Sequence, residues 1–198
     1  MKEENEMKDT KVLLQEIDKE LRKNLSEKRY QHSIGVMKKA EELAKKYNVD
    51  INKARLVGLA HDIAKEMPRE EKLQYIQNHQ IEIDEIEKIN VELLHGKIGA
   101  DICKEKFEFS EDMQNAIKYH TTGNPEMDDL AKIILIADKT EAGRTYIDFE
   151  KVAESEKKSL NAEVVYLLDV SIKYTIDKGS LVHPDSIITR NGFLLENR

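Results

Sequence analysis

The chain has 198 residues, of which 39% are hydrophobic and 36% charged, with only 8 glycines and 3 prolines. This length can bury one substantial core, and the low glycine and proline content argues against a collagen, a disordered linker protein or a turn-rich all-β fold. The formal net charge is −7, from 32 basic and 39 acidic residues. An acidic chain without a basic block is a poor candidate for nucleic-acid binding, although a few local cations can still bind a small phosphate compound.

The sequence carries no sign of a membrane or secreted protein. No apolar run approaches the ~20 residues of a membrane-spanning helix, and the first eleven residues are polar, without the apolar centre of a signal peptide. The single cysteine, Cys103, cannot form an internal disulfide, which suits a reducing compartment. We therefore expect a cytoplasmic protein with neither membrane nor nucleic-acid partners.

Helical periodicity dominates the chain. Ser26 and the acidic Glu27 predict the start of a helix that runs to about Tyr47, and a second helix is expected over 51–64, ending before Pro68. Further helices are expected over 69–78, 90–106, 110–120 and 160–178, the last stopped by Gly179. The apolar run 130–137 fits a buried helix, with a buried strand as the alternative, and Pro184 can open a short last helix or turn. These patterns predict an all-α, single compact helical bundle with loose ends over residues 1–8.

Histidine and aspartate on apolar faces form the most informative pattern. His61-Asp62 lies within the predicted second helix, among apolar neighbours. Polar groups placed in a core must find partners, and a metal ion is one possibility. On the dipeptide alone, a buried, hydrogen-bonded His–Asp pair is the favoured explanation, so a metal site needs further residues.

Four further residues supply such support. His32, His95 and His120 each lie on the apolar face of a predicted helix, and Asp138 follows the apolar run. Each alone is explained by core packing, but a fold that packs these faces together brings six imidazole and carboxylate groups together. Such ligands suit iron, manganese, zinc or a similar divalent ion.

The order of these motifs resembles the HD-domain superfamily of metal-dependent phosphohydrolases, and within it the bacterial YqeK group of symmetrical diadenosine tetraphosphate hydrolases. The strings that carry the resemblance are Arg29-Tyr30-Gln31-His32-Ser33, His61-Asp62-Ile63-Ala64-Lys65, His95-Gly96, His120-Thr121-Thr122-Gly123, Ala137-Asp138-Lys139, Glu141-Ala142-Gly143-Arg144, His183-Pro184 and Arg190-Asn191. The resemblance covers about residues 25–191. It implies an HD phosphohydrolase domain over 25–198, with residues 1–24 as an N-terminal helical extension of the same domain.

The resemblance also implies a ligand set for a divalent metal. The residues that match the primary ligands are His32, His61, Asp62 and Asp138. His95 and His120 would ligate a second metal with Asp62 bridging, contact phosphate directly, or protonate the leaving group. Iron is the expected metal, with manganese, cobalt or nickel as alternatives, as one or two ions.

Other residues that match the family would complete the site. Asp62 and Lys65 are expected to be catalytic, with Lys65 orienting Asp62 or neutralising charge on the phosphate. Residues expected to bind substrate are Arg29, Thr121, Thr122, Gly123, Lys139 and Arg144, with the two arginines as phosphate clamps. His183 and Arg190 are candidates for the nucleotide end of the pocket, whereas His79, in a polar stretch, is expected at the surface.

The implied reaction is metal-dependent hydrolysis of diadenosine tetraphosphate to two ADP. Another HD phosphohydrolase, such as a nucleotidase or a phosphodiesterase for a signalling nucleotide, would share the same metal ligands. A non-catalytic nucleotide sensor and a purely structural helical protein are further alternatives. The expected partner is a small nucleotide, and a homodimer is possible.

Overall fold

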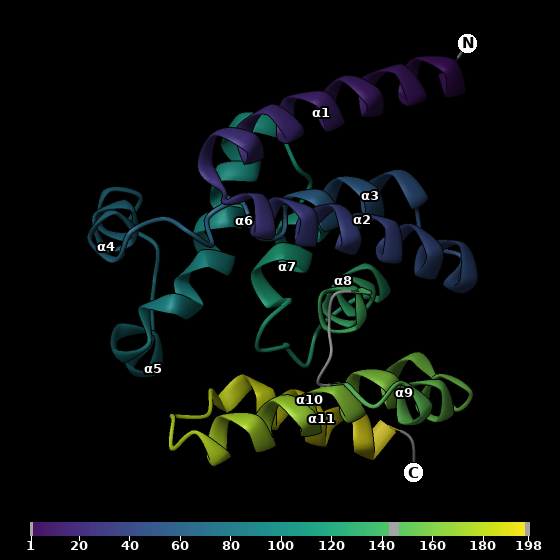
Figure 1. The fold of residues 1–198 in the computed structure, drawn as a ribbon, viewed down its shortest axis with the longest axis vertical. Coiled ribbons are helices and arrows are strands. Elements are labelled where there is room, and N and C mark those ends of the chain that lie inside the picture. The colour runs from purple at the N-terminus through teal and green to yellow at the C-terminus, as the bar shows by residue number, and fades with distance from the viewer. Residues whose placement is uncertain (1, 143–146, 197–198) are drawn as a thin grey trace.

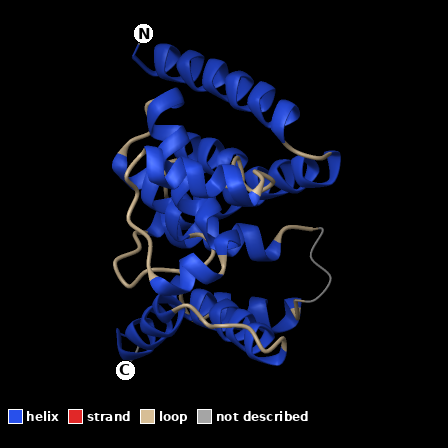
Figure 2. Cartoon of the chain, turned by 90° about the vertical axis from the view of Figure 1, so that its left-hand side faces the viewer, coloured by secondary structure: helices blue, strands red, loops and turns tan. Residues whose placement is uncertain are grey.

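The computed structural model describes the backbone of residues 2–142 and 147–196, and the side chains of these ranges from Thr10 onward. Within them every regular element is helical, and Figure 2 shows no strand. The α-helices are α1 (Lys2–Asn24), α2 (Glu27–Tyr47), α3 (Ile51–Ala60), α4 (Arg69–Asn78), α5 (Glu85–Ile89), α6 (Leu94–Phe107), α7 (Glu111–Tyr119), α8 (Asp129–Thr140), α9 (Phe149–Glu156), α10 (Leu160–Asp177) and α11 (Pro184–Glu196), with a 3₁₀ turn η1 (Val91–Leu93) before α6. The predicted all-α fold is confirmed.

Local signals fix most of the helix ends. Ser26 caps α2 through a hydrogen bond that its hydroxyl accepts from the Arg29 amide. Gly179 follows α10 with a positive φ of 65°, as expected of a glycine that stops a helix. At the N-terminus helical backbone begins at Lys2, within the segment 1–8 that was expected to be loose. Helix α1 ends at Asn24, the expected boundary of the N-terminal extension. The division of the domain into this extension and residues 25–198 stays a prediction.

The second predicted helix ends earlier than the sequence indicated, and this correction matters for the site. Helix α3 stops at Ala60, so His61 is its C-terminal cap and Asp62 lies in the turns that follow. The Gly58 carbonyl accepts a hydrogen bond from His61 Nδ1 at 2.8 Å. Beyond it the backbone bonds span three residues rather than four, as from the Ile63 amide to the Ala60 carbonyl. The tighter turn presents His61 and Asp62 at a helix end.

Three other expectations change in detail. The run 130–137 lies in helix α8, so the strand alternative is wrong. Pro184 opens a helix, one of the two expected alternatives, but this helix has 13 residues and is longer than expected. Helices α5 and α9 were not expected; they have only 5 and 8 residues, too few for a clear apolar period.

The helices form a main body, a side unit and a covering layer. In Figure 1, α2, α3, α7 and α8 lie in the body, α4 and α5 project to one side, and α9, α10 and α11 form the layer below α8. The largest apolar cluster extends from α1 to α11 and includes most of the buried residues of α3 and α8. A smaller cluster joins α4, η1 and α6 through Ile76, Val91, Leu94 and Ile98. No described helix is both long enough and apolar enough to cross a membrane.

Candidate metal centre

Five helices deliver six ionisable side chains to one place in the main body. His32 lies on α2, His61 and Asp62 at the end of α3, His95 at the start of α6, His120 at the end of α7 and Asp138 near the end of α8. His61, Asp62, His95 and His120 are each at most 2% exposed. The packing of the apolar faces has thus brought these residues together, as the sequence predicted.

One half of the centre is rich in carboxylates. His32 Nε2 lies 3.1 Å from Asp138 Oδ1 and 3.8 Å from Asp62 Oδ2. His61 Nε2 lies 3.4 Å from the same Asp62 oxygen and 3.8 Å from Asp138 Oδ1. Two imidazole nitrogens therefore face two carboxylate oxygens across a gap of a few ångströms.

The other half pairs two histidines against the second oxygen of Asp62. Asp62 Oδ1 lies 3.3 Å from His95 Nε2 and 3.7 Å from His120 Nε2. These two ring nitrogens lie 3.1 Å from each other. Asp62 therefore divides its carboxylate, with Oδ2 toward His32 and His61 and Oδ1 toward His95 and His120.

Three of the histidine rings carry their proton on Nδ1, so the lone pair of Nε2 points into the centre. Nδ1 donates to a backbone carbonyl in His61 (Gly58, 2.8 Å), His95 (Glu92, 2.5 Å) and His120 (Ile117, 2.6 Å). In the neutral ring Nε2 is then an acceptor, and two such acceptors face each other between His95 and His120. His61 Nε2 and Asp62 Oδ1 are buried without a hydrogen-bond partner. A cation resolves these unsatisfied acceptors, so the residues present fit a divalent metal.

The electrostatics differ between the two halves. Burial and the Lys65 ammonium lower the pKa of His95 to about 4, and burial also lowers the pKa of His120. Burial has the same effect on His61, but the Asp62 and Asp138 carboxylates outweigh it and raise its pKa. The pKa of Asp62 lies well below its usual value despite burial, because three imidazoles face it. The centre therefore holds an ionised carboxylate between histidines.

Two neighbouring residues contact the candidate ligands. Glu141 Oε1 lies 3.2 Å from His32 Nδ1, so its carboxylate can fix the ring with Nε2 toward the centre. Arg29 donates from Nη1 to Asp62 Oδ2 at 2.8 Å, and so contacts a candidate ligand directly. Sequence reasoning gave Glu141 no role. Its only signal was its position one turn after Asp138, in a segment already matched to the family.

The expected catalytic lysine and a threonine lie at the mouth of the centre. Lys65 Nζ is 3.3 Å from His95 Nε2, and Thr121 Oγ1 is 3.1 Å from His120 Nε2. Both residues line a cavity of about 510 Å³ that leads away from the centre toward α10 and the loop before α11. Thr122 and Lys139 also line it. Its far end is formed by Val170, Ile172, Tyr174, Leu181, Val182 and His183, together with the hydroxyl residues Ser171, Thr175 and Ser186.

The remaining candidates are placed as follows. Gly123 has a positive φ of 76°, and a side chain there would meet Thr189 of α11, so the glycine serves close packing. His183 lines the cavity and contacts Asp84 at 2.7 Å, whereas Arg190 pairs with Asp169 and is not among the lining residues. His79 is exposed, as expected. Arg144 lies outside the described residues.

Comparison with known proteins agrees with this geometry. The HD domain family model matches residues 29–143, and the chain belongs to this family. A Halalkalibacterium halodurans protein named symmetrical bis(5'-nucleosyl)-tetraphosphatase is 38% identical over 88% of this chain and 94% of its own length. A Bacillus subtilis protein of the same name is 33% identical over 86% and 92%. A crystal structure from Clostridium acetobutylicum, described as a predicted HD superfamily hydrolase involved in NAD metabolism, is 40% identical and covers 92% of this chain and 97% of its own, with a TM-score of 0.87.

Proposed function

We propose that the chain is a metal-dependent phosphoanhydride hydrolase that cleaves diadenosine tetraphosphate symmetrically to two ADP. The observation that carries the proposal is the buried Asp62 carboxylate, shared between two sets of imidazoles at the end of a cavity. The symmetrical tetraphosphatase name of the 38% and 33% identical relatives supports the choice of substrate. We therefore assign the cavity to the nucleotide.

The first ion would be held by His32, His61, Asp62 and Asp138, and a second by Asp62, His95 and His120. Ions held there supply Lewis acidity and make water nucleophilic near neutral pH. A second ion is favoured over direct phosphate contact because His95 and His120 present two lone pairs to one carboxylate oxygen. Iron, the expected metal, is part of this proposal; a homodimer and a cytoplasmic location stay predictions.

The chain's own cations and hydroxyls would bind the phosphates. Lys65 and Lys139 both line the cavity, and Lys65 lies beside His95, where its ammonium can neutralise charge that develops during hydrolysis. Thr121 can donate its hydroxyl to a phosphate oxygen at the same end. Arg29 holds Asp62 in place, and Arg144 is proposed as a further phosphate clamp on the family motif alone. The far end of the cavity combines apolar side chains with hydroxyl groups, which suits the base and the ribose of a nucleoside.

Product analysis tests the proposal. Metal-loaded protein is incubated with diadenosine tetraphosphate, with a chelated sample as control, and the nucleotides are separated by anion exchange. ADP as the only product, formed only with metal, is the expected result. ATP plus AMP would reject symmetrical cleavage, and tight binding without turnover would indicate a nucleotide sensor instead.

A further inference from the structure

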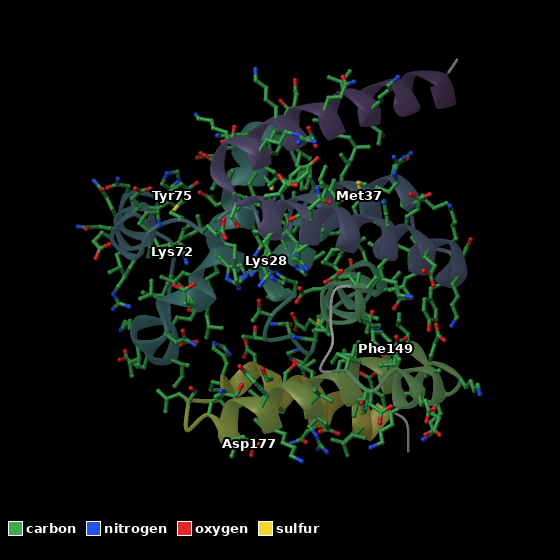
Figure 3. The ribbon with its side chains drawn as sticks, viewed as in Figure 1. Lys28, Met37, Lys72, Tyr75, Phe149 and Asp177 are labelled. Carbon is green, nitrogen blue, oxygen red and sulfur yellow. The ribbon has the colours of Figure 1, made fainter. Side chains whose placement is uncertain are left out.

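A buried lysine outside the motifs lies behind the catalytic end of the site. Lys72 is on the first turn of α4 and is 1% exposed, whereas the neighbouring Leu73 is 38% exposed. Figure 3 labels Lys72 on α4, toward the body of the molecule. A lysine buried more deeply than the adjacent leucine does not follow from apolar patterning, so its partners must explain its place.

The Lys72 ammonium joins two segments that are far apart in sequence. Its Nζ donates to the Lys65 backbone carbonyl at 3.2 Å and to Glu92 Oε2 at 3.1 Å. The first segment is the turn after α3, and the second is η1. Burying an ammonium ion costs several kcal/mol unless it is paired and hydrogen-bonded, and these two acceptors supply the pairing.

Each of these segments holds one residue of the site. The Lys65 side chain reaches His95 Nε2 at 3.3 Å. The Glu92 backbone carbonyl accepts from His95 Nδ1 at 2.5 Å, which sets the direction of the ring. Lys72 therefore contacts the main chain of one site residue and the side chain of the residue that orients the other.

We propose that Lys72 is a positioning residue that holds Lys65 and His95 in register with each other. The inference rests on the proposed hydrolase function, because it concerns the catalytic end of that same site. The contacts of Lys72 lead to Lys65 and Glu92, and both of these residues contact His95, so its effect falls on the His95–His120 half. Loss of Lys72 should lower the affinity for the second ion and slow turnover, while the affinity for the first ion stays the same.

The test substitution is Lys72→Met, which keeps an unbranched apolar side chain of nearly the same length and removes the ammonium group. Support for a ligand from outside its direct contacts is typically worth about 10- to 100-fold in metal affinity or activity. We expect kcat to fall within that range with KM little changed. In a titration with Mn²⁺, we expect the weaker of two Kd values to rise at least about 10-fold and the tighter one to stay.

Lys53→Met is the control. Lys53 Nζ also pairs with a carboxylate on a segment distant in sequence, Asp112 at 2.6 Å, but this pair lies at the far ends of α3 and α7 from the metal centre. This variant should keep kcat and both Kd values. A double-mutant cycle with Lys65→Met separates positioning from general stability. If Lys72 acts through Lys65, Lys72→Met in that background should lower kcat far less than it does in the wild type.

Wild-type kcat and unchanged Mn²⁺ binding in Lys72→Met, or full additivity in the cycle together with unchanged binding, would overturn the proposal. If Lys72→Met fails to fold, Glu92→Gln serves instead, because that side chain is 66% exposed and its backbone carbonyl is retained. Glu92→Gln should also raise the weaker Mn²⁺ Kd. An unchanged Kd in this variant would count against the proposal. Wild-type protein that binds Mn²⁺ but does not hydrolyse the substrate would remove the proposed function alone, since the Kd comparison stands without turnover.

Discussion

Two regions of the molecule each bury a carboxylate, and the pKa of the carboxylate is shifted in opposite directions in the two regions. Asp62, at the end of α3, is 2% exposed, yet its pKa lies well below its usual value because three imidazoles face it. Glu163, on α10, is 1% exposed, and burial raises its pKa to about 7. Its hydrogen-bond partner is the Tyr47 hydroxyl, at a long 3.4 Å. The exposed fractions of the two residues are similar, so the groups that face each carboxylate decide its charge.

The comparison separates a binding centre from a buried acid. At Asp62 an ionised carboxylate faces ring nitrogens, and its own Oδ1 and His61 Nε2 are buried without a hydrogen-bond partner, which suits a cation site. At Glu163 the nearby Glu156 further raises the pKa, and the carboxylate gains little by ionising. A perturbed pKa alone therefore does not identify a site; the direction and the partners do.

The largest expected effect comes from Asp62→Asn. The amide keeps the shape but removes the charge shared by both halves of the centre. Losing even about 4 kcal/mol of transition-state stabilisation corresponds to about 1,000-fold in rate, so we expect kcat for diadenosine tetraphosphate to fall at least that far. Glu163→Gln, the same change in the other region, is the control and should keep kcat. Equal losses in both variants would break the comparison.

Metal removal should affect only the Asp62 region. An ion present at about 100 times its Kd stabilises the folded state by about 2.7 kcal/mol, which at this chain length corresponds to about 5–10 °C in Tm. Thermal unfolding with and without chelator should show this shift in the wild type and in Glu163→Gln. Asp62→Asn should show almost none, and a full shift in that variant would place the ion elsewhere.

The dependence of folding stability on pH should show the effect of Glu163. Between the ordinary pKa of 4.5 and about 7 the unfolded chain ionises this residue while the folded chain keeps it protonated. Folding therefore loses stability as the pH rises through this window, and Glu163→Gln removes the loss. We expect the variant to be about 1–3 kcal/mol more stable than the wild type at pH 8 and nearly equal at pH 4. Denaturant unfolding at both pH values measures this, and a variant less stable at pH 8 would show that the carboxylate is ionised and well paired.

The smallest effect is expected from Tyr47→Phe. Its hydroxyl donates to Glu163 Oε2 over 3.4 Å, and a hydrogen bond of this kind contributes about 0.5–1 kcal/mol or less. The loss should appear mainly above pH 7, where Glu163 is ionised and needs the donor. A loss of several kcal/mol, or one independent of pH, would mean that the ring packing rather than the hydroxyl matters.

The fold and the six central residues were accessible from sequence because both depend on helical periodicity. Polar side chains on apolar faces must meet when those faces pack, which is how His32, His95 and His120 could be placed beside His61-Asp62. The early end of α3 could not be predicted from the sequence, since it goes with a hydrogen bond from the His61 ring to the Gly58 backbone carbonyl.

The contacts that support the central residues could not be predicted from the sequence either. Glu141 with His32, Arg29 with Asp62 and Lys72 with Glu92 join positions 109, 33 and 20 residues apart. No local spacing rule relates such positions. They become visible only once the helices are packed, and they fix the positions of the candidate ligands and of the residues beside them.

A crystal structure of the metal-loaded protein, with anomalous scattering recorded at the metal edge, tests the central assignment most directly. We predict one peak among His32, His61, Asp138 and Asp62 Oδ2, and a second among His95, His120 and Asp62 Oδ1. The same crystals of Asp62→Asn should lack both peaks. An ordered, fully loaded protein without a peak at Asp62 would contradict the account.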